Sequence, residues 1–277
     1  MTTAGAAVGR LLVCPTPIGN LEDVTLRVLD ALRKADVVAC EDTRHTRVLL
    51  ERYGIRTPLL SLHEHNERAR TGELVRRIAS GELVALVSDA GTPLVSDPGF
   101  GLVRSCLQEG LEVEVLPGPS AVVTALVASG LPADRWRFVG FLPRRRRLLE
   151  DLLAGTTETL VAFESARRLA ATLALLAGRD PGRAAAVCRE LTKRHEEVRR
   201  GRASELAEHY REHPPRGEVV LVIGAAPAPE AQLLDALAAL REIVAAGARA
   251  RPAAGAIARL TGVAANELYR ELMRAEQ

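Results

Sequence analysis

The sequence contains no apolar run that approaches the ~20 residues needed to span a bilayer as a helix. Residues 1–10 also lack the basic segment followed by an apolar stretch that marks a secretory signal. We therefore expect a soluble, cytoplasmic protein with no membrane partner. The chain has 4 cysteines, widely spaced and without a CxxC pair, which favours buried free thiols over disulfides or a zinc site.

Lysine and aromatic side chains are scarce as well. Only Lys34 and Lys193 are lysines among 37 basic residues, and aromatic residues make up 3% of the chain. The net charge of +2 argues against a polycation that coats nucleic acid. Arginine suits phosphate recognition, although codon usage in a G+C-rich genome is the simpler explanation of a composition rich in arginine and alanine.

Three common site motifs are also missing. The chain has no GxxxxGK[ST], which excludes a P-loop nucleotidase, and the segment Gly99-Phe100-Gly101 lacks the third glycine of a Rossmann fingerprint. HExxH is absent too, and His63 and His65 are expected to point to opposite faces of an extended segment. We therefore expect no metal site.

The residues that are present predict an α/β protein. A length of 277 residues corresponds to two domains of roughly 100–200 residues each. Up to residue 116, short apolar runs alternate with segments of helical spacing, which predicts a parallel sheet. The expected strands are 10–14, 36–40, 58–62, 83–88 and 112–116, and the expected helices are 26–35, 43–53, 69–80 and 100–109.

The alternation resumes after a Pro-Gly-Pro-Ser segment at 117–120, where we place the domain boundary. Expected strands follow at 137–141, 158–164, 184–190 and 218–224, with helices at 121–129, 144–154, 167–176 and 203–212. Residues 225–230 have linker composition. About three helices come next, and 257–260 with 265–273 have helix-turn-helix spacing, although a packing appendage without a nucleic-acid role is slightly favoured. The expected domains are 1–117 and 118–225, followed by 226–277 as linker and helical tail.

Four polar loops follow expected strands of the first half, at 15–23, 40–47, 61–67 and 88–99. Ligands of open α/β sheets bind outside the carboxyl ends of the strands. A twelve-residue loop rich in Gly and Pro, such as 88–99, is costly to keep after a buried strand unless it forms a site. In the 40–47 loop, Asp42 or Thr43 serves equally well as a plain helix cap.

Nine motifs occur in order between Leu11 and Gly224: PTPIGNLED, CEDTR, SLHEHNE, VSDAGTPLVSDPG, LPGPSA, FVGFLPR, FES, RELTK and GEVVLVIG. In this order they resemble the tetrapyrrole-methylase-like, or class III, S-adenosylmethionine-dependent methyltransferases, most closely the branch that acts on ribosomal RNA. One such motif is weak, but nine in order are specific. The resemblance implies two α/β domains of the tetrapyrrole methylase type, with S-adenosylmethionine in the cleft between them and a small C-terminal helical appendage.

The resemblance also implies cofactor contacts, motif by motif. In the first domain and at the boundary they are Pro17, Gly19, Asp89, Gly91, Thr92, Leu94, Ser96, Ser120 and Ala121. In the second domain they are Phe163, Glu164, Arg189, Glu190, Val220 and Leu221. S-adenosylmethionine needs acceptors for its amino and ribose groups and oxygen atoms near its sulfonium, which such loops supply.

Methyl transfer is an in-line displacement with an excellent leaving group, so the protein mainly positions the acceptor. A neutral ribose hydroxyl is a poor nucleophile, and a general base or a cation near its oxygen helps. The loops offer Glu41, Asp42, Arg44, His63 and Lys193 as candidates. We favour Glu41 or Asp42 together with Lys193.

The resemblance implies that the substrate is a cytidine 2′-hydroxyl in the decoding region of 16S rRNA, within the small ribosomal subunit, and that the enzyme is a homodimer. The candidate phosphate contacts are Arg44, Arg47, Arg144, Arg145, Arg146 and Arg147, although a charge run is usually a solvated helix face. The tail departs from the family pattern, because Ala264–Glu267 replaces a lysine-rich stretch.

Two alternatives remain open at this point. One is a small-molecule methyltransferase of the same fold that acts on a tetrapyrrole or corrinoid, since arginines would also suit an anionic tetrapyrrole. The other is a non-catalytic RNA-binding assembly factor, which would have no need of S-adenosylmethionine.

Overall fold

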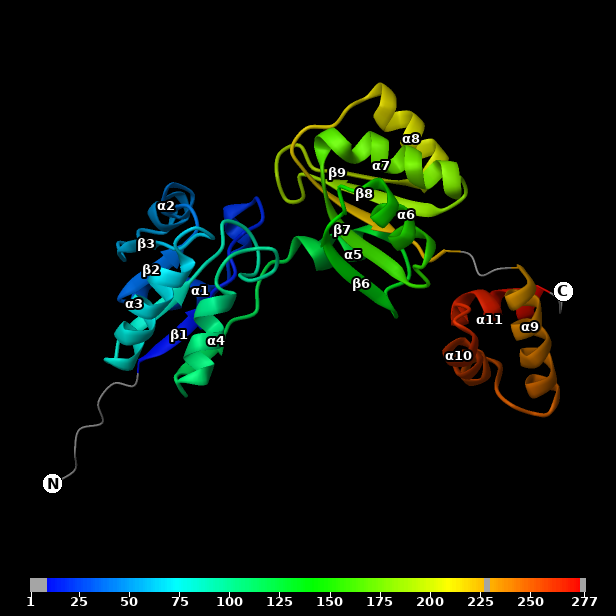
Figure 1. Ribbon diagram of the computed structural model, residues 1–277, viewed down its shortest axis with the longest axis horizontal. Helices are drawn as coiled ribbons and strands as arrows, with labels where there is room; N and C mark the ends of the chain where they lie inside the picture. Colours follow the sequence, from blue (N-terminus) through cyan, green and yellow to red (C-terminus); the bar gives the residue numbers. More distant parts are fainter. Residues whose placement is uncertain (1–8, 227–229, 275–277) are drawn as a thin grey trace. The chain divides into compact units, whose positions relative to one another are not determined.

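The computed structural model describes residues 9–226 and 230–274 (Figure 1). These residues form two compact units. The first contains residues 9–124 and Glu190–Glu196, and the second contains Ala125–Arg189 and the described residues from Glu197 onward. Each unit has its own five-stranded sheet, so the chain is an α/β protein, as its sequence predicts.

The first unit is built on a sheet of order β3-β2-β4-β1-β5, in which every pair is parallel. Its strands are β1 (Arg10–Val13), β2 (Val37–Cys40), β3 (Leu59–Ser61), β4 (Leu83–Leu86) and β5 (Glu112–Val115). Its helices are α1 (Leu26–Lys34), α2 (Thr43–Arg52), α3 (Glu67–Ala79) and α4 (Phe100–Gln108). The predicted parallel sheet is therefore confirmed.

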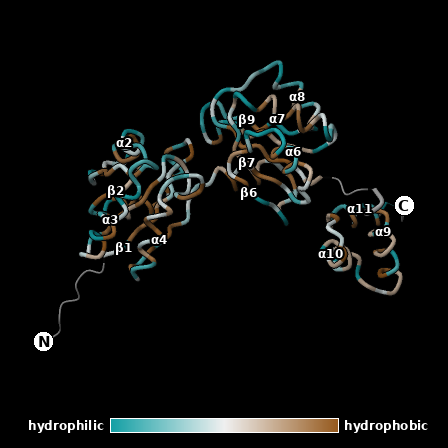
Figure 2. Tube along the Cα trace, viewed as in Figure 1, coloured by the Kyte–Doolittle hydropathy of each residue, from teal (hydrophilic) through white to brown (hydrophobic). Residues whose placement is uncertain are grey.

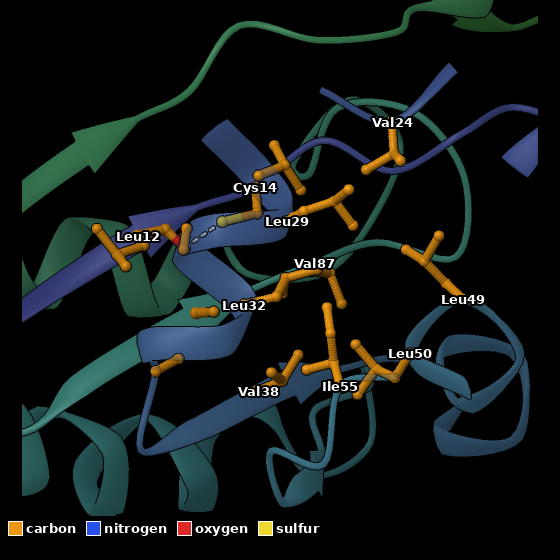
Figure 3. Packing of buried hydrophobic residues seen from close by; sticks show 14 of the residues in the cluster. Leu12, Cys14, Val24, Leu29, Leu32, Val38, Leu49, Leu50, Ile55 and Val87 are labelled. Atoms are coloured by element: carbon orange, nitrogen blue, oxygen red, sulfur yellow. Dashed lines mark hydrogen bonds between the residues drawn. The ribbon is translucent and has the colours of Figure 1, made fainter. Parts of the chain in front are cut away.

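Helices cover both faces of this sheet. Leu12 belongs to one apolar core together with Leu29 of α1 and Leu50 of α2 (Figure 3). Leu11, one residue earlier, points to the other face and packs in a second core with α3 and α4, because successive side chains of a strand alternate. Figure 2 shows the hydrophobic character of these strands. All four cysteines are buried and free, as predicted.

The strand order places a topological switch point at the carboxyl ends of β1 and β4. From β1 the chain crosses through α1 to β2 in one direction, and from β4 it crosses through α4 to β5 in the other. The loops that follow these two neighbouring strands therefore diverge to opposite faces of the sheet. Ligands of open α/β sheets bind at such a point.

The second unit has a mixed sheet of order β6-β7-β10-β8-β9. Its strands are β6 (Trp136–Phe141), β7 (Thr159–Ser165), β8 (Ala184–Arg189), β9 (Glu197–Arg202) and β10 (Glu218–Ile223). Only β6 and β7 pair in parallel. Its helices are α6 (Arg146–Ala154), α7 (Ala166–Arg179) and α8 (Ala203–Glu212), which pack on one face, and α5 (Ala121–Ser129) carries the chain from the first unit into the second.

The C-terminal residues form three helices, α9 (Glu230–Ala245), α10 (Ala250–Thr261) and α11 (Ala265–Arg274), around a core of their own. The expected helix at 257–260 is the end of the longer α10. Half of the expected linker, at 227–229, and most of the N-terminal segment without signal character, at 1–8, lie outside the described residues. Within the described parts of the chain, no helix is both long and apolar enough to cross a membrane.

Candidate functional site

Three motif loops meet at the carboxyl ends of β1, β4 and β5. The backbone of Thr16 exchanges two hydrogen bonds with that of Gly91, at 2.8 and 3.0 Å. The Thr92 hydroxyl donates to the carbonyl oxygen of Pro119 at 3.3 Å. The structure thus joins the loop that contains Pro17 and Gly19, the 88–99 loop and the segment before Ser120, which are distant in sequence.

The 88–99 loop has an unusual backbone. Leu94 and Ser96 have φ angles of 73° and 70°, in the left-handed region that residues with a side chain rarely adopt. Buried Ser88 secures the start of the loop, because its hydroxyl donates to the Gly91 carbonyl at 3.1 Å. Strained backbone of this kind clusters at ligand sites, which is consistent with the cofactor role expected of Asp89, Gly91, Thr92, Leu94 and Ser96.

The end of the same loop is held by Glu67, the first residue of α3. One oxygen of its carboxylate accepts hydrogen bonds from the backbone N–H groups of Gly99, at 3.1 Å, and Gly101, at 2.9 Å. These N–H groups belong to the start of α4, where the helix dipole favours a negative charge. Glu67 therefore ties the SLHEHNE motif to the principal motif loop.

Carboxylates gather at the switch point. Asp42 donates its backbone N–H to Oδ1 of Asp89 at 3.1 Å. Burial, and then repulsion from Asp89, raises the pKa of Glu41, although His63 opposes this. Burial, followed by repulsion from Glu41 and Asp89, raises the pKa of Asp97 to about 6. Carboxylates whose negative charges lie this close together favour a positively charged ligand in their midst.

The pKa of Asp42 is shifted in the opposite direction to that of Glu41. Its carboxylate accepts the Arg44 backbone N–H at 2.8 Å as the N-cap of α2 and pairs with the Arg44 guanidinium at 2.6 Å. These hydrogen bonds from Arg44 hold the pKa of Asp42 far below its usual range. Because a carboxylate with a very low pKa is a weak base, Glu41 fits the role of general base better.

Lys193 packs within the first unit, although its segment follows β8 of the second. Its Nζ pairs with the carboxylate of Glu190 at 3.0 Å. Glu190 and Thr192 have φ angles of 50° and 63°, so this turn too is in the left-handed region. A Cβ on Gly19 would lie 2.5 Å from Cγ of Lys193. The glycine therefore allows the turn to approach the loop after β1.

The second unit's candidates divide between the two faces of its sheet. Leu221 is fully buried in the core beneath the helices. Glu164 points to the same face and accepts a hydrogen bond from the hydroxyl of Thr172 in α7 at 2.6 Å. Because side chains alternate along a strand, Val220 and Phe163 face the opposite way. Leu221 and Glu164 thus lie on the face that the helices cover, and Phe163 and Val220 lie on the other face.

Two of these candidates lie in side-chain clusters. Phe163 packs against Phe138 and Phe141, with ring centroids 5.1 and 5.4 Å apart. Arg189 pairs with Glu197 at 3.1 Å. The arrangement holds both side chains in defined positions at the ends of β7 and β8.

The run Arg144–Arg147 lies at the start of α6, where all four side chains are exposed. Arg146 pairs with Glu150 at 2.7 Å. Cations near a helix N-terminus oppose the helix dipole, so an arginine run at this position favours a bound anion. Arg44 and Arg47 are also exposed, on α2.

The expectation that His63 and His65 point to opposite faces is wrong. Residues 64–66 form a turn rather than an extended segment, and the two rings pack edge to face with centroids 6.0 Å apart. The Asn66 side chain stabilises this turn by accepting the His63 backbone N–H at 2.9 Å. Across residues 9–226 and 230–274, no group of three or more His, Cys, Asp or Glu side chains is placed to hold a metal ion.

Sequence reasoning does not single out Glu67 or Asp97. Both lie within motifs that the sequence displays, SLHEHNE and VSDAGTPLVSDPG. Their acidic character within these motifs is the available signal, since a carboxylate suits exposed backbone N–H groups. Their partners, however, come from other loops, which only the fold brings close.

Comparison with known proteins identifies similar chains. Residues 10–207 match the family described as Tetrapyrrole (Corrin/Porphyrin) Methylases. "Ribosomal RNA small subunit methyltransferase I" of Mesorhizobium japonicum is 47% identical over 269 residues, which cover 95% of this chain and 91% of the relative. The protein of that name from Escherichia coli O157:H7 is 41% identical, with 97% and 96% covered.

Among solved structures, uroporphyrin-III C-methyltransferase from Thermus thermophilus, complexed with S-adenyl homocysteine, aligns with a TM-score of 0.55. It is 23% identical, and the alignment covers 78% of this chain and 97% of that one. This likeness shows a shared fold.

Proposed function

Because the chain belongs to the tetrapyrrole (corrin/porphyrin) methylase family, we propose that it methylates the 2′-hydroxyl of a cytidine in the decoding region of 16S rRNA. The chain is a methyltransferase, and S-adenosylmethionine is its methyl donor. The relatives named for small-subunit rRNA are 41% and 47% identical over nearly the whole chain, which supports an rRNA substrate. The motif resemblance supports the cytidine 2′-hydroxyl as its acceptor.

The observation that carries the proposal is the group of carboxylates at the switch point of the first sheet. Asp89, Glu41 and Asp97 act on one another electrostatically, and burial together with this repulsion raises the pKa of Asp97 to about 6. A sulfonium and an ammonium group are cations that such carboxylates stabilise. The donor set therefore fits S-adenosylmethionine, with the 88–99 loop and the segments of Gly19 and Ser120 as its proposed contacts.

When bound, S-adenosylmethionine supplies an electrophilic methyl group on a sulfonium leaving group. The chain's own task is to hold the ribose hydroxyl in line and to accept its proton. Glu41 is the proposed acceptor of this proton, because its pKa lies above the ordinary value of a glutamate. Asp42 holds α2 and Arg44 in place. Lys193, held by Glu190 at 3.0 Å, is the proposed cation near the acceptor oxygen.

The proposed RNA contacts are the exposed arginines of two helix starts, Arg44 and Arg47 on α2 and Arg144–Arg147 at α6. Backbone phosphates are the anions that would relieve the repulsion between the arginine run and the helix dipole. The motif resemblance further supports the small ribosomal subunit as the substrate particle and a homodimer acting in the cytoplasm.

The test is transfer of radioactive methyl from S-adenosylmethionine to purified small ribosomal subunits and to protein-free rRNA. The product is then mapped by alkaline hydrolysis, which cannot cleave next to a 2′-O-methyl ribose. We expect label in one alkali-resistant dinucleotide that begins with cytidine.

Label in an alkali-sensitive product would contradict ribose methylation. It would still show that the chain methylates rRNA, at a site other than a ribose 2′-hydroxyl. Absence of label on either RNA, with calorimetry showing intact binding of S-adenosylmethionine, would instead support the small-molecule alternative. Absence of cofactor binding as well would favour the non-catalytic assembly factor.

A further inference from the structure

A hollow of about 350 Å³ lies in the first unit beside the loop after β1. Its volume is in the range of small-molecule sites. We name it the Asp23 pocket. Its apolar walls and its polar side chains come from Ile18, Pro119, Asp23, Thr25, Thr124 and Thr192.

The Asp23 pocket is built from the same loops as the proposed cofactor contacts, but from different residues. Ile18 lies between Pro17 and Gly19, and Pro119 directly precedes Ser120. A Cβ on Gly91 would lie 3.5 Å from Cγ2 of Ile18 and 3.7 Å from the carbonyl oxygen of Pro119. The pocket therefore adjoins the proposed donor site in space, which is where an acceptor has to bind.

Thr192 enters the pocket because of a close approach at Gly19. A Cβ on Gly19 would lie 2.7 Å from the hydroxyl oxygen of Thr192. That oxygen accepts a hydrogen bond from the Asn20 backbone N–H at 2.9 Å, which fixes its position and leaves the hydroxyl proton to be donated. The Thr25 oxygen likewise accepts the Val28 N–H at 3.1 Å.

The polar groups of the pocket comprise one carboxylate and three hydroxyls, without a cation. Asp23 is exposed, and among the described residues its carboxylate has no hydrogen-bond or ion-pair partner. A ligand that complements this set donates a hydrogen bond to Asp23 and accepts from threonine hydroxyls. Phosphates and carboxylates are disfavoured by repulsion from Asp23.

We propose that the Asp23 pocket receives the base of the acceptor nucleotide, and that Asp23 accepts a hydrogen bond from the exocyclic amine of cytosine. This inference rests on the proposed rRNA function. The N4 amine of cytosine can donate a hydrogen bond to a carboxylate. Uracil presents a carbonyl oxygen at the same position, and a carboxylate repels it. A base that enters a protein pocket loses its stacking on neighbouring bases. Apolar contact with Ile18 and Pro119 would replace that stacking.

The experiment compares Asp23→Asn with wild type on small-subunit rRNA that carries either cytidine or uridine at the methylated position. We expect the cytidine preference in kcat/KM to fall by about tenfold or more, because asparagine can donate to the uracil carbonyl. The affinity for S-adenosylmethionine should not change.

Glu22→Gln is the matched control, since Glu22 is adjacent, exposed and paired with Arg52 at 3.5 Å, outside the pocket. It should keep the wild-type preference. An Asp23→Asn enzyme that discriminates as strongly as wild type would overturn the proposal.

If the proposed rRNA function itself is wrong, the result differs, because the wild-type enzyme would then methylate neither the cytidine nor the uridine RNA. In that case the binding of cytidine and of uridine is measured by NMR titration of the protein saturated with S-adenosylhomocysteine. Cytidine binding that weakens at least fivefold in Asp23→Asn, but not in Glu22→Gln, supports the pocket. Equal binding of both nucleosides refutes it.

Discussion

At the scale of a single residue, we expect Asp97 to make ligand binding depend on pH. Burial, with repulsion from Glu41 and Asp89, raises its pKa to about 6, so below that pH the carboxyl is mostly neutral. A cationic ligand at the switch point binds the ionised form better and lowers this pKa. We predict that the Kd for S-adenosylmethionine, measured by calorimetry, rises several-fold between pH 7 and pH 5, and that Asp97→Asn flattens this dependence.

The free protein provides an independent check on the same residue. Because the folded-state pKa of Asp97 is raised, its contribution to stability is fully present below about pH 4 and is lost as the pH rises through 6. Asp97→Asn should therefore have a higher Tm than wild type at pH 7 and a similar Tm at pH 4. An affinity that varies equally with pH in both proteins would contradict the assignment.

Glu41 and Asp42 are adjacent carboxylates with opposite pKa shifts, which separates their roles. We predict that Glu41→Gln lowers kcat by about a hundredfold, the lower range for loss of a general base, with little change in the Kd of S-adenosylmethionine. Asp42→Asn keeps an N-cap side chain on α2 and should retain most of the turnover. The measurement is methyl transfer to rRNA at saturating donor. A larger loss in Asp42→Asn than in Glu41→Gln would reverse the assignment.

At the scale of elements, Glu67 joins the start of α3 to the start of α4. Glu67→Gln keeps the size of the side chain but replaces one carboxylate oxygen with an amide group, so the hydrogen bonds to Gly99 and Gly101 weaken. We predict that the 88–99 loop loses order and that the Kd of S-adenosylmethionine rises about tenfold, more than kcat changes. Hydrogen exchange of residues 88–101 provides the structural readout.

Glu73→Gln on the same helix is the control for Glu67→Gln, because Glu73 pairs with Arg70 at 2.6 Å, whereas the hydrogen bonds to Gly99 and Gly101 come from Glu67. Unchanged exchange and unchanged affinity in Glu67→Gln would show that Glu67 does not position the loop.

The elements differ in how far their sequences predict them. The strands of the first sheet are short apolar runs bounded by turn residues, and the sequence predicts all five. It does not predict β9, because an edge strand with the sequence EVRRGR is mostly polar and has no buried run. Nor does it predict the mixed pairing of the second sheet, since antiparallel partners β10 and β8 have the same continuous apolar content as parallel strands.

At the scale of the whole molecule, the candidate site too is only partly predictable from the sequence. Motifs identify the loops, and parallel topology explains why their ends meet at one edge of the sheet. Two contacts between loops are beyond the sequence: Glu67 with the start of α4, and Gly19 against Lys193. Each depends on side-chain geometry between segments that no local pattern relates.

The distribution of charge over the whole molecule gives the last prediction. The net charge is only +2, so affinity for RNA has to come from local clusters such as Arg144–Arg147. We predict that Arg145→Gln with Arg147→Gln lowers the slope of log affinity against log salt by about 0.7–0.9 for each phosphate that is no longer neutralised. Fluorescence anisotropy with labelled small-subunit rRNA measures it. The charge-matched pair Arg179→Gln with Arg211→Gln should leave the slope unchanged, and equal slopes in all three proteins would exclude phosphate binding at α6.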